Sequence, residues 1–340
     1  MQSRREFLMK MAMLTSGVML PWPSILSQKD KYGAILPYRK LGNTGEKITM
    51  LGLGGFHIGQ PSEAEAQAMI EKAIEKGIRF FDNAHDYHKG ESEKRYGKFL
   101  VPKYRDEVFI MTKSGAKDYK TAKEELERSL SRMKTDQVDL WQLHSLKNPE
   151  DVDSRINNGV LKAVEEALKE KKIRYAGFTC HNSPRAMLRM LEQAEGSGLF
   201  STAQMPINVI DAYSDPSFIN HVLPQLNKQN IAVLGMKSLA DGRFFEKKLR
   251  FGREIWQTET PLIPDVISVE EAIQFAWTMP ISSLIVGTDN VSMLEEKIEF
   301  VKRMSQVDEE YRKNLLAKIS DYPLLKKVEY YKKDRDYSLG

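Results

Sequence analysis

The sequence predicts an α/β protein built as a (β/α)8 (TIM) barrel, with an N-terminal β-hairpin and an extra C-terminal helix. Strand and helix signals alternate eight times between positions 50 and 303. The strand segments are mostly continuous apolar runs, as expected where a parallel sheet is buried on both faces. Eight such units within about 255 residues match the size of a barrel.

The composition of the chain narrows the possible functions. The chain has 340 residues, a formal net charge of +4 and a hydrophobic fraction of 41%, which fits one large barrel or two ordinary domains. It has no dense basic stripe interleaved with aromatic residues, so we do not expect a nucleic-acid partner. The single cysteine, Cys180, excludes an intrachain disulfide, a cysteine zinc cage and a protein-ligated iron–sulfur cluster.

The first 27 residues are expected to be a signal peptide. Ser3-Arg-Arg-Glu-Phe-Leu8 resembles a twin-arginine (Tat) export signal, and the apolar run Met11–Leu20 follows it. That run is about half as long as a helix that spans a bilayer, so no stable membrane span is expected. The motif predicts the Tat translocase as a partner and a periplasmic location, or a cytoplasmic one if the signal does not function. The alternative is a disordered basic tail.

The body of the chain begins with a hairpin over residues 38–48, whose turn is the sequence Gly-Asn-Thr-Gly. Strands are expected at 50–53, 78–81, 108–112, 138–143, 173–178, 202–206, 231–236 and 283–286. Helices are expected at 62–76, 91–100, 120–133, 157–171, 183–193, 217–229, 267–278 and 291–303. A doubly wound sheet is the alternative, but Gly52-Leu-Gly-Gly55 lacks the third glycine of a dinucleotide fingerprint.

The barrel domain is placed at residues 36–320, and three segments of the chain do not fit a minimal barrel. Residues 239–266 form a long insertion after the seventh strand, rich in aromatic and charged residues. Residues 307–320 are expected to form the extra helix. Residues 321–340 form a C-terminal tail, and its lysine-rich part, Lys326 to Lys333, is expected to be a solvated surface.

Four polar side chains follow or end three predicted strands and point to catalysis: Asp82, Tyr87, Lys113 and His144. The carboxyl ends of barrel strands meet at one rim, so these side chains are expected to lie together. A lysine beside a tyrosine lowers the tyrosine's pKa, and a carboxylate holds the lysine in place. A histidine hydrogen-bonds a carbonyl. The set suits carbonyl reduction, and the histidines lack the carboxylates of a metal site.

The stretch from Gly77 to Tyr87, G-I-R-F-F-D-N-A-H-D-Y, resembles the G-x-R-x-x-D-T-A-x-x-Y motif of the aldo-keto reductases, with Asn83 in place of threonine. The resemblance covers residues 36–320. It implies an oxidoreductase in which Tyr87 is the general acid/base, Lys113 and Asp82 tune it, and His144 orients the carbonyl. The implied substrate is a small aldehyde, ketone or sugar.

The resemblance also implies a nicotinamide cofactor, NADP or NAD, bound across the mouth of the barrel. The residues implied to bind it are Gly54, Gly55, Asp82, Thr179, Gln204, Met236, Lys237, Ser238, Gly287, Thr288, Glu296 and Lys297. The asparagine of the family's G-x-S-N motif is Cys180 here, with His181 and Asn182 as candidate substitutes.

The residues around the last strand bear on the choice of cofactor. Gly287 and Met293 stand where the family usually carries the lysine and arginine that grip the 2′-phosphate of NADP, and Asp289 adds a negative charge. The sequence therefore predicts dual use or a preference for NAD, with Lys297 as a candidate to restore one contact.

Two functions stay open from the sequence. The first is the NAD(P)-dependent oxidoreductase, favoured by the intact set of four residues. The alternative is a non-catalytic nucleotide-binding barrel that acts as a sensor or accessory subunit. The substrate, the direction of the reaction and the oligomeric state are not determined.

Overall fold

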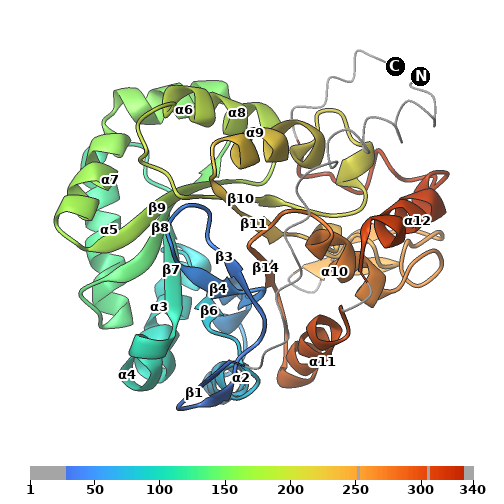
Figure 1. Cartoon of the computed structure of the whole chain (residues 1–340), viewed down its shortest axis with the longest axis horizontal. Helices are drawn as coiled ribbons and strands as arrows, with labels where there is room; N and C mark the ends of the chain where they lie inside the picture. Colours follow the sequence, from blue (N-terminus) through green and yellow to red (C-terminus); the bar gives the residue numbers. More distant parts are fainter. Residues whose placement is uncertain (1–27, 251–252, 305–306, 333–340) are drawn as a thin grey trace.

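The core of the protein is a closed barrel of eight parallel strands, which confirms the predicted fold (Figure 1). The computed structural model describes residues 28–250, 253–304 and 307–332. The strands follow one another around the barrel in chain order, and the last one pairs with the first. They are β5 (Leu51–Leu53), β6 (Phe80–Phe81), β7 (Phe109–Ser114), β8 (Val138–Leu146), β9 (Ile173–Cys180), β10 (Thr202–Pro206), β11 (Ala232–Met236) and β14 (Ser283–Val286).

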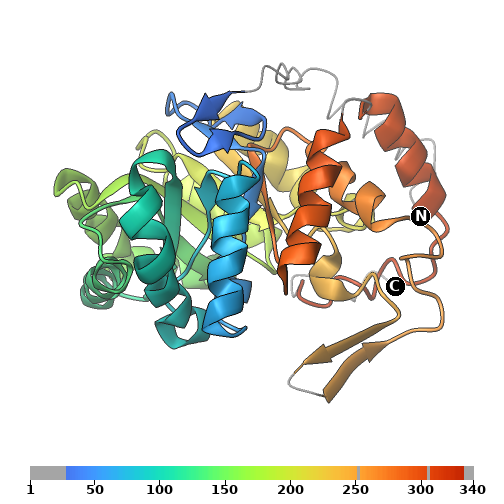
Figure 2. The same cartoon turned by 90° about the horizontal axis from the view of Figure 1, so that it is seen from below.

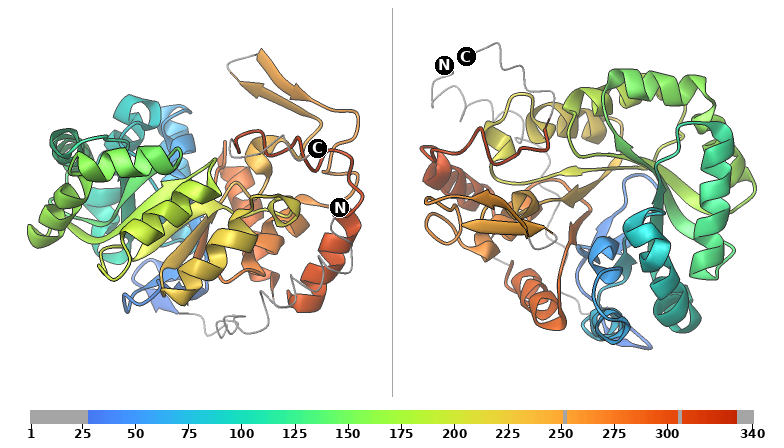
Figure 3. Two further views of the ribbon diagram at one scale, coloured as in Figure 1. Left: turned by 90° about the horizontal axis from the view of Figure 1, so that it is seen from above. Right: turned by 180° about the vertical axis from the view of Figure 1, so that it is seen from behind.

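Helices surround the strands, as the views in Figures 1 and 3 show. Six of them lie within two residues of their predicted bounds. These are α2 (Glu63–Glu75), α5 (Tyr119–Met133), α8 (Pro184–Gln193), α10 (Val269–Trp277), α11 (Val291–Lys302) and α12 (Glu309–Ile319). Each of them is preceded by a Ser, Asp or Asn whose side chain accepts a hydrogen bond from a backbone N–H of the first turn.

Three helical regions differ from the prediction. The helix expected at 157–171 is α7 (Val160–Lys169), and an additional helix that was not predicted, α6 (Pro149–Asn157), precedes it, with Gly159 between them in a left-handed conformation. The start signal missed was Asn148, which caps α6 just before a proline. The other two contain a π-helical turn, between α3 (Glu91–Arg95) and α4 (Val101–Tyr104) and before α9 (Leu223–Lys228).

The predicted hairpin, β3 (Tyr38–Lys40) with β4 (Lys47–Thr49), closes the end of the barrel where the strands begin. Leu41 and Ile48 are buried in one apolar cluster with inward side chains of the barrel strands. Arg39 donates hydrogen bonds to backbone carbonyls at and beyond the end of α10, and its burial lowers its pKa to about 10. A second hairpin, β1 (Lys29–Asp30) with β2 (Gly33–Ala34), was not predicted.

The insertion after β11 carries a hairpin that the sequence did not predict, β12 (Lys247–Arg250) with β13 (Arg253–Gln257). Figures 2 and 3 show it projecting away from the barrel. Its base is attached to the preceding loop, because the Trp256 indole donates to the Phe245 carbonyl over 3.2 Å. Among the described residues, no helix combines the length and the apolar character that a membrane span requires.

The C-terminal tail is not a solvated surface throughout, which corrects the expectation for Lys326 to Lys333. Lys326 and Lys327 are exposed, but Lys332 is only 3% exposed. Its ammonium lies between the carboxylates of Asp211 and Glu329, at 2.5 Å from Glu329 Oε2. The tail therefore folds back over the loop that follows β10, and a buried ion cluster fixes it there.

We predict that Lys332→Met destabilises the protein by about 3–5 kcal/mol, because it leaves two carboxylates buried without their cation. Urea unfolding of wild type and variant measures this difference. Lys326→Met is the matched control, since it removes an exposed lysine six residues away, and we expect it to stay near the wild-type value. Equal unfolding midpoints for wild type and Lys332→Met would contradict the assignment.

Candidate active site

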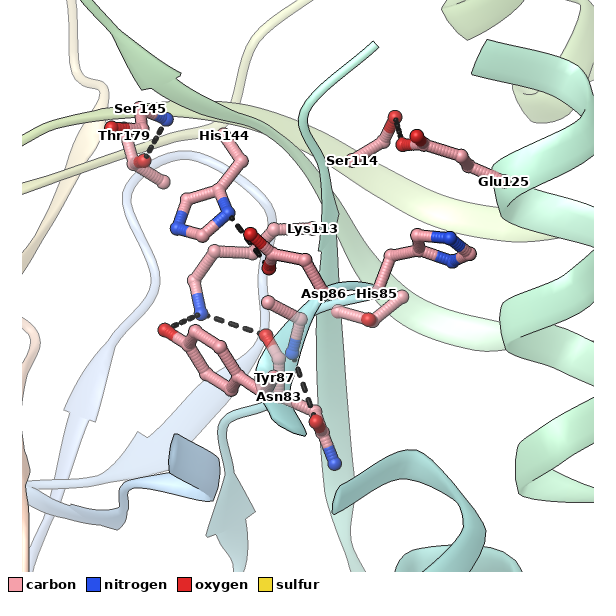
Figure 4. A network of polar contacts seen from close by, with 12 residues as sticks. Asn83, His85, Asp86, Tyr87, Lys113, Ser114, Glu125, His144, Ser145 and Thr179 are labelled. Carbon is pink, nitrogen blue, oxygen red and sulfur yellow. Dashed lines mark hydrogen bonds and ion pairs between the residues drawn. The ribbon is translucent and has the colours of Figure 1, made fainter. Parts of the chain in front are cut away.

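The structure brings the four predicted catalytic side chains together at the carboxyl ends of neighbouring strands. Figure 4 shows three of them, Tyr87, Lys113 and His144. Asp82 follows β6 directly, and Tyr87 lies on the next turn. Lys113 stands near the end of β7 and His144 near the end of β8. The strands pair in the order β6, β7, β8, so the three strand ends lie side by side.

Lys113 connects the group. Its ammonium donates to the Tyr87 hydroxyl over 3.1 Å and to the Asn83 carbonyl over 2.7 Å, and it pairs with the Asp82 carboxylate. The lysine is 1% exposed, so these partners replace its hydration. Asp82 is fixed in turn, because the Gly55 N–H donates to its carboxylate over 3.3 Å.

Gly55 is a glycine for steric reasons. A Cβ atom at this position would lie 2.1 Å from the Asp82 carbonyl oxygen, which no side chain tolerates. The close approach places the backbone of the first barrel loop directly against the aspartate. The Tyr96 hydroxyl holds the same carbonyl of Asp82 over 2.9 Å.

The pKa of Tyr87 moves in the direction opposite to the one expected from the sequence. Burial raises it well above 10, and the charges of Asp82 and Asp86 add to the rise. The Lys113 ammonium does not reverse this, because Asp82 neutralises its charge in the same contact. Burial also lowers the pKa of Lys113, and the nearby Asp82 opposes that change. At neutral pH Tyr87 is a neutral phenol, which is the form that donates a proton.

His144 is 8% exposed, and burial lowers its pKa below the ordinary value. Its Nδ1 atom lies 3.5 Å from Oδ1 of Asp86, and the histidine holds the pKa of Asp86 down at about 2. The backbone beside it is fixed by Arg155, which donates to the His144 carbonyl over 3.2 Å. Ser145 has a left-handed φ of 55°, and its N–H donates to Thr179 Oγ1 over 2.8 Å.

The predicted cofactor residues on the far side of the mouth lie on β9, β10 and the start of the loop after β11. Gln204 pairs in register with Thr179 and is 2% exposed. Its side-chain oxygen has no hydrogen-bond partner among the described residues. Its nitrogen contacts the sulfur of Met236 at 3.6 Å. Lys237 follows with a φ of 54° and pairs with Asp241 over 3.2 Å, and Ser238 is next to it.

The turn after β14 leads from Gly287 and Thr288 into the start of α11. Lys297 does not point out of this turn as a phosphate ligand, which corrects the suggestion that it restores a lost contact. It is 3% exposed, and its ammonium donates to the Gly287 carbonyl over 2.6 Å. Burial lowers its pKa to about 8. Glu296 is exposed on α11. His57, on the loop after β5, has its Nδ1 atom 2.7 Å from the Asp289 carboxylate on the neighbouring turn after β14.

Cys180 is buried, and its sulfur contacts the carbonyl oxygens of Leu146 and Ser183 at 2.9 and 3.3 Å. These contacts place the sulfur among β8, β9 and the start of α8, as expected for a packed cysteine. Sequence reasoning did not single out Asp86 or the His57–Asp289 pair. The position of Asp86 next to Tyr87 was the only signal for it, and a lone exposed aspartate in a loop is usually a solvated group.

The comparisons with known proteins agree with the fold and show the family. The model of the aldo/keto reductase family matches residues 50–274, and the chain belongs to this family of oxidoreductases. The chain is 27% identical to the oxidoreductase YqkF of Bacillus subtilis, over 81% of this chain and 94% of that one. It is 25% identical to L-galactose dehydrogenase of Arabidopsis thaliana, over 79% of this chain and 89% of that one.

A solved structure also superposes on the barrel. It is the holo form of the aldo-keto reductase AKR11C1 from Bacillus halodurans, with a TM-score of 0.68 and 20% identity. The match covers 83% of this chain and 96% of that one. At this level of identity the match supports the fold alone.

Proposed function

We propose that the protein is an NAD(P)(H)-dependent oxidoreductase that reduces or forms the carbonyl group of a small aldehyde, ketone or sugar. The observation that carries the proposal is the contact of a neutral, partly buried tyrosine with a buried lysine–aspartate pair at the mouth of the barrel. The similarity to a dehydrogenase that is named for a sugar, L-galactose, supports a sugar among the candidate substrates.

The residues around the mouth fit a nicotinamide dinucleotide. The side-chain oxygen of Gln204 is buried and lacks a partner among the described residues, so it is available to accept from a carboxamide. Backbone N–H groups at the start of α11 suit a phosphate, because a helix N-terminus carries a partial positive charge. Lys237 and Ser238 follow β11, which lies between β10, the strand of Gln204, and β14, the strand before α11. A bound dinucleotide supplies the hydride that the protein itself does not carry.

The protein's own residues donate the proton that the carbonyl oxygen receives. In reduction, the Tyr87 O–H donates a hydrogen bond to the carbonyl oxygen and transfers its proton as negative charge develops there. Lys113 then stabilises the phenolate, since its ammonium already donates to the Tyr87 oxygen. Asp82 keeps the ammonium in this place. Formation of the carbonyl follows the same path in reverse.

We predict that Tyr87→Phe lowers kcat by at least about a hundred-fold, because it removes the proton donor but no residue assigned to the dinucleotide. Steady-state assays with a panel of aldehydes and sugars measure turnover, and fluorescence titration measures the binding of the reduced cofactor. The dissociation constant of the cofactor is expected to stay within a few-fold of wild type.

Tyr175→Phe is the matched control, because that tyrosine lies at the opposite end of the barrel against the N-terminal hairpin. It is expected to keep wild-type turnover. If Tyr87→Phe retains turnover within ten-fold of wild type, Tyr87 is not the general acid. Cofactor binding without turnover of any carbonyl by the wild type would favour the non-catalytic alternative, which has no support from the comparisons.

We further propose that NAD is used at least as readily as NADP. Gly287 and Met293 provide no cation, and the ammonium of Lys297 is occupied by the carbonyl of Gly287. The Asp289 carboxylate is exposed at the same turn and would repel a 2′-phosphate. Two charge-assisted hydrogen bonds to phosphate, each about 1.5–3 kcal/mol, are therefore missing.

We predict that NADH binds with an affinity equal to or greater than that of NADPH. Titration of both reduced cofactors by fluorescence at one ionic strength measures the two dissociation constants. The variant Asp289→Asn is expected to improve NADPH binding more than NADH binding, because only NADPH carries the repelled phosphate. NADPH binding a hundred-fold tighter than NADH binding in the wild type would contradict this assignment of the turn.

We also propose that the protein is exported to the periplasm by the Tat translocase. Residues 1–27 lie outside the residues that the structure describes, so the proposal rests on the Arg4-Arg5 motif alone. The Tat route carries folded proteins, which allows the cofactor to be loaded before export.

We predict that replacing Arg4 and Arg5 by lysine leaves the protein in the cytoplasm, since the paired arginines are the recognised feature. Fractionation of cells that express each form, followed by immunoblotting, measures the location. A wild-type protein that stays in the cytoplasm would show that no export signal acts here, and unchanged periplasmic delivery of the variant would show that a different signal does.

A further inference from the structure

A buried ion pair lies against the loop of residues 85–90, which carries Tyr87. Glu93 of α3 is 0% exposed, and its carboxylate accepts a hydrogen bond over 3.0 Å from Nη1 of Arg132, near the end of α5. The other carboxylate oxygen accepts from the Thr112 hydroxyl over 2.7 Å. Thr112 precedes Lys113 on β7, and successive side chains of a strand point to opposite faces. One strand therefore directs Lys113 to Tyr87 and Thr112 to the ion pair.

Arg132 also holds the backbone of the loop before Tyr87. The same Nη1 atom donates to the His85 carbonyl over 2.8 Å and lies 3.2 Å from Nδ1 of the His85 ring. The N–H of His85 donates to the Lys113 carbonyl over 2.9 Å. Figure 4 shows the His85 side chain pointing toward the helix of Glu125, away from the Tyr87 ring. His85 is therefore fixed by β7 on one side and by α5 on the other, two residues before the tyrosine.

The loop continues after Tyr87 through a turn of uncommon backbone conformation. His88, Lys89 and Gly90 have φ angles of 50°, 57° and 87°, a left-handed region that is unfavourable for the first two. Such a conformation persists only where the surrounding structure fixes it. A Cβ atom on Gly90 would lie 2.2 Å from Cζ of Arg132, so the guanidinium packs directly against the backbone of the turn. One guanidinium group thus contacts the loop both before and after Tyr87.

We propose that Arg132 is a positioning residue for proton transfer: with Glu93 as its counterion, it fixes the loop and thereby places the Tyr87 hydroxyl against the carbonyl of the substrate. The proposal rests on the proposed function and adds to it a residue that acts through the tyrosine. Lys113 holds the hydroxyl end of the ring over 3.1 Å, and Arg132 holds the backbone from which the ring extends. Proton transfer requires the donor within hydrogen-bonding distance of the acceptor, so a displaced loop slows the reaction while the dinucleotide still binds.

The first test compares the kinetics of Arg132→Met and Arg132→Lys with wild type in carbonyl reduction. Arg132→Met is expected to lower kcat by about ten- to a hundred-fold, the effect of a misplaced reacting group. The dissociation constant of the reduced cofactor, measured by fluorescence titration, is expected to stay within two-fold of wild type. Arg132→Lys keeps a positive charge beside Glu93 but loses the planar set of donors, so we expect a kcat at least about three-fold below wild type and a nearly unchanged unfolding midpoint.

Arg128→Met is the matched control, because Arg128 is exposed one turn earlier on the same helix and its loss removes the same charge. Its kcat is expected to stay within two-fold of wild type. Urea unfolding of each variant gives the fraction that is folded under assay conditions. A fall in kcat per folded molecule at unchanged cofactor affinity distinguishes positioning of the tyrosine from a general loss of stability.

The second test does not depend on turnover. Carbon-13 NMR of protein with labelled tyrosine rings reports the surroundings of each ring, and the Tyr87 signal is assigned by its loss in Tyr87→Phe. We expect one sharp Tyr87 signal at the same position in wild type and Arg128→Met. In Arg132→Met the signal is expected to shift or broaden, because the ring then samples more than one position.

The outcomes separate the inference from the function on which it rests. A kcat of Arg132→Met within two-fold of wild type, or a Tyr87 signal that this variant leaves unchanged, would overturn the inference while carbonyl reduction stands. Should Arg132→Met not fold, Arg132→Lys decides, and a kcat within two-fold of wild type would then contradict the role of Arg132. If the wild type reduces no carbonyl compound, the proposed function fails, and the NMR result still decides whether Arg132 fixes Tyr87.

Discussion

The arrangement of the active site depends on the burial of one ammonium group. Lys113 is 1% exposed in the wall of the barrel, and a charge in that place is stable only if every donor finds a partner. Its three contacts come from Asp82, the Asn83 carbonyl and Tyr87, all on the segment that follows β6. Satisfying the lysine therefore fixes the conformation of that segment, and the tyrosine is held at hydrogen-bonding distance as a consequence.

The same constraint extends outward to the backbone. Asp82 remains in position because Gly55 approaches it more closely than any residue with a side chain permits. This links β5 to β6, while the pairing of β6, β7 and β8 sets the distance from Lys113 to His144. The barrel acts as the rigid scaffold, and the polar contacts at its mouth select one arrangement of the loops.

The sequence predicted the barrel well because its evidence is local. Apolar strands, amphipathic helices and capping residues repeat with short periods, and each unit is visible without knowledge of its neighbours. The grouping of Asp82, Tyr87, Lys113 and His144 was also predictable, since parallel strands bring their ends together whatever their separation along the chain. Helix α6 was missed for a local reason, because Asn148 was not recognised as the cap of a helix start.

What the sequence did not reveal is which charged residues are buried, and this limit accounts for the main corrections. Lys113, Lys297 and Lys332 look alike in the sequence, as do the many lysines on the surface. In the structure the first is held by a carboxylate and a phenol, the second by a backbone carbonyl, and the third by two carboxylates. Each set of partners joins segments that are distant along the chain or are placed only by the folding of a loop.

The chemical consequence of burying a lysine depends on the group that pairs with its ammonium. The ammonium of Lys297 donates to the Gly287 carbonyl, which supports the proposal that NAD is used at least as readily as NADP. A lysine neutralised by Asp82 cannot lower the pKa of Tyr87 in the way that an isolated ammonium would, so the tyrosine stays protonated and acts as a donor. The proton state of the site is therefore set by the fold: burial, with the charges of Asp82 and Asp86, keeps the phenol neutral, and burial lowers the pKa of His144. Neither state is a property of the tyrosine or the histidine alone.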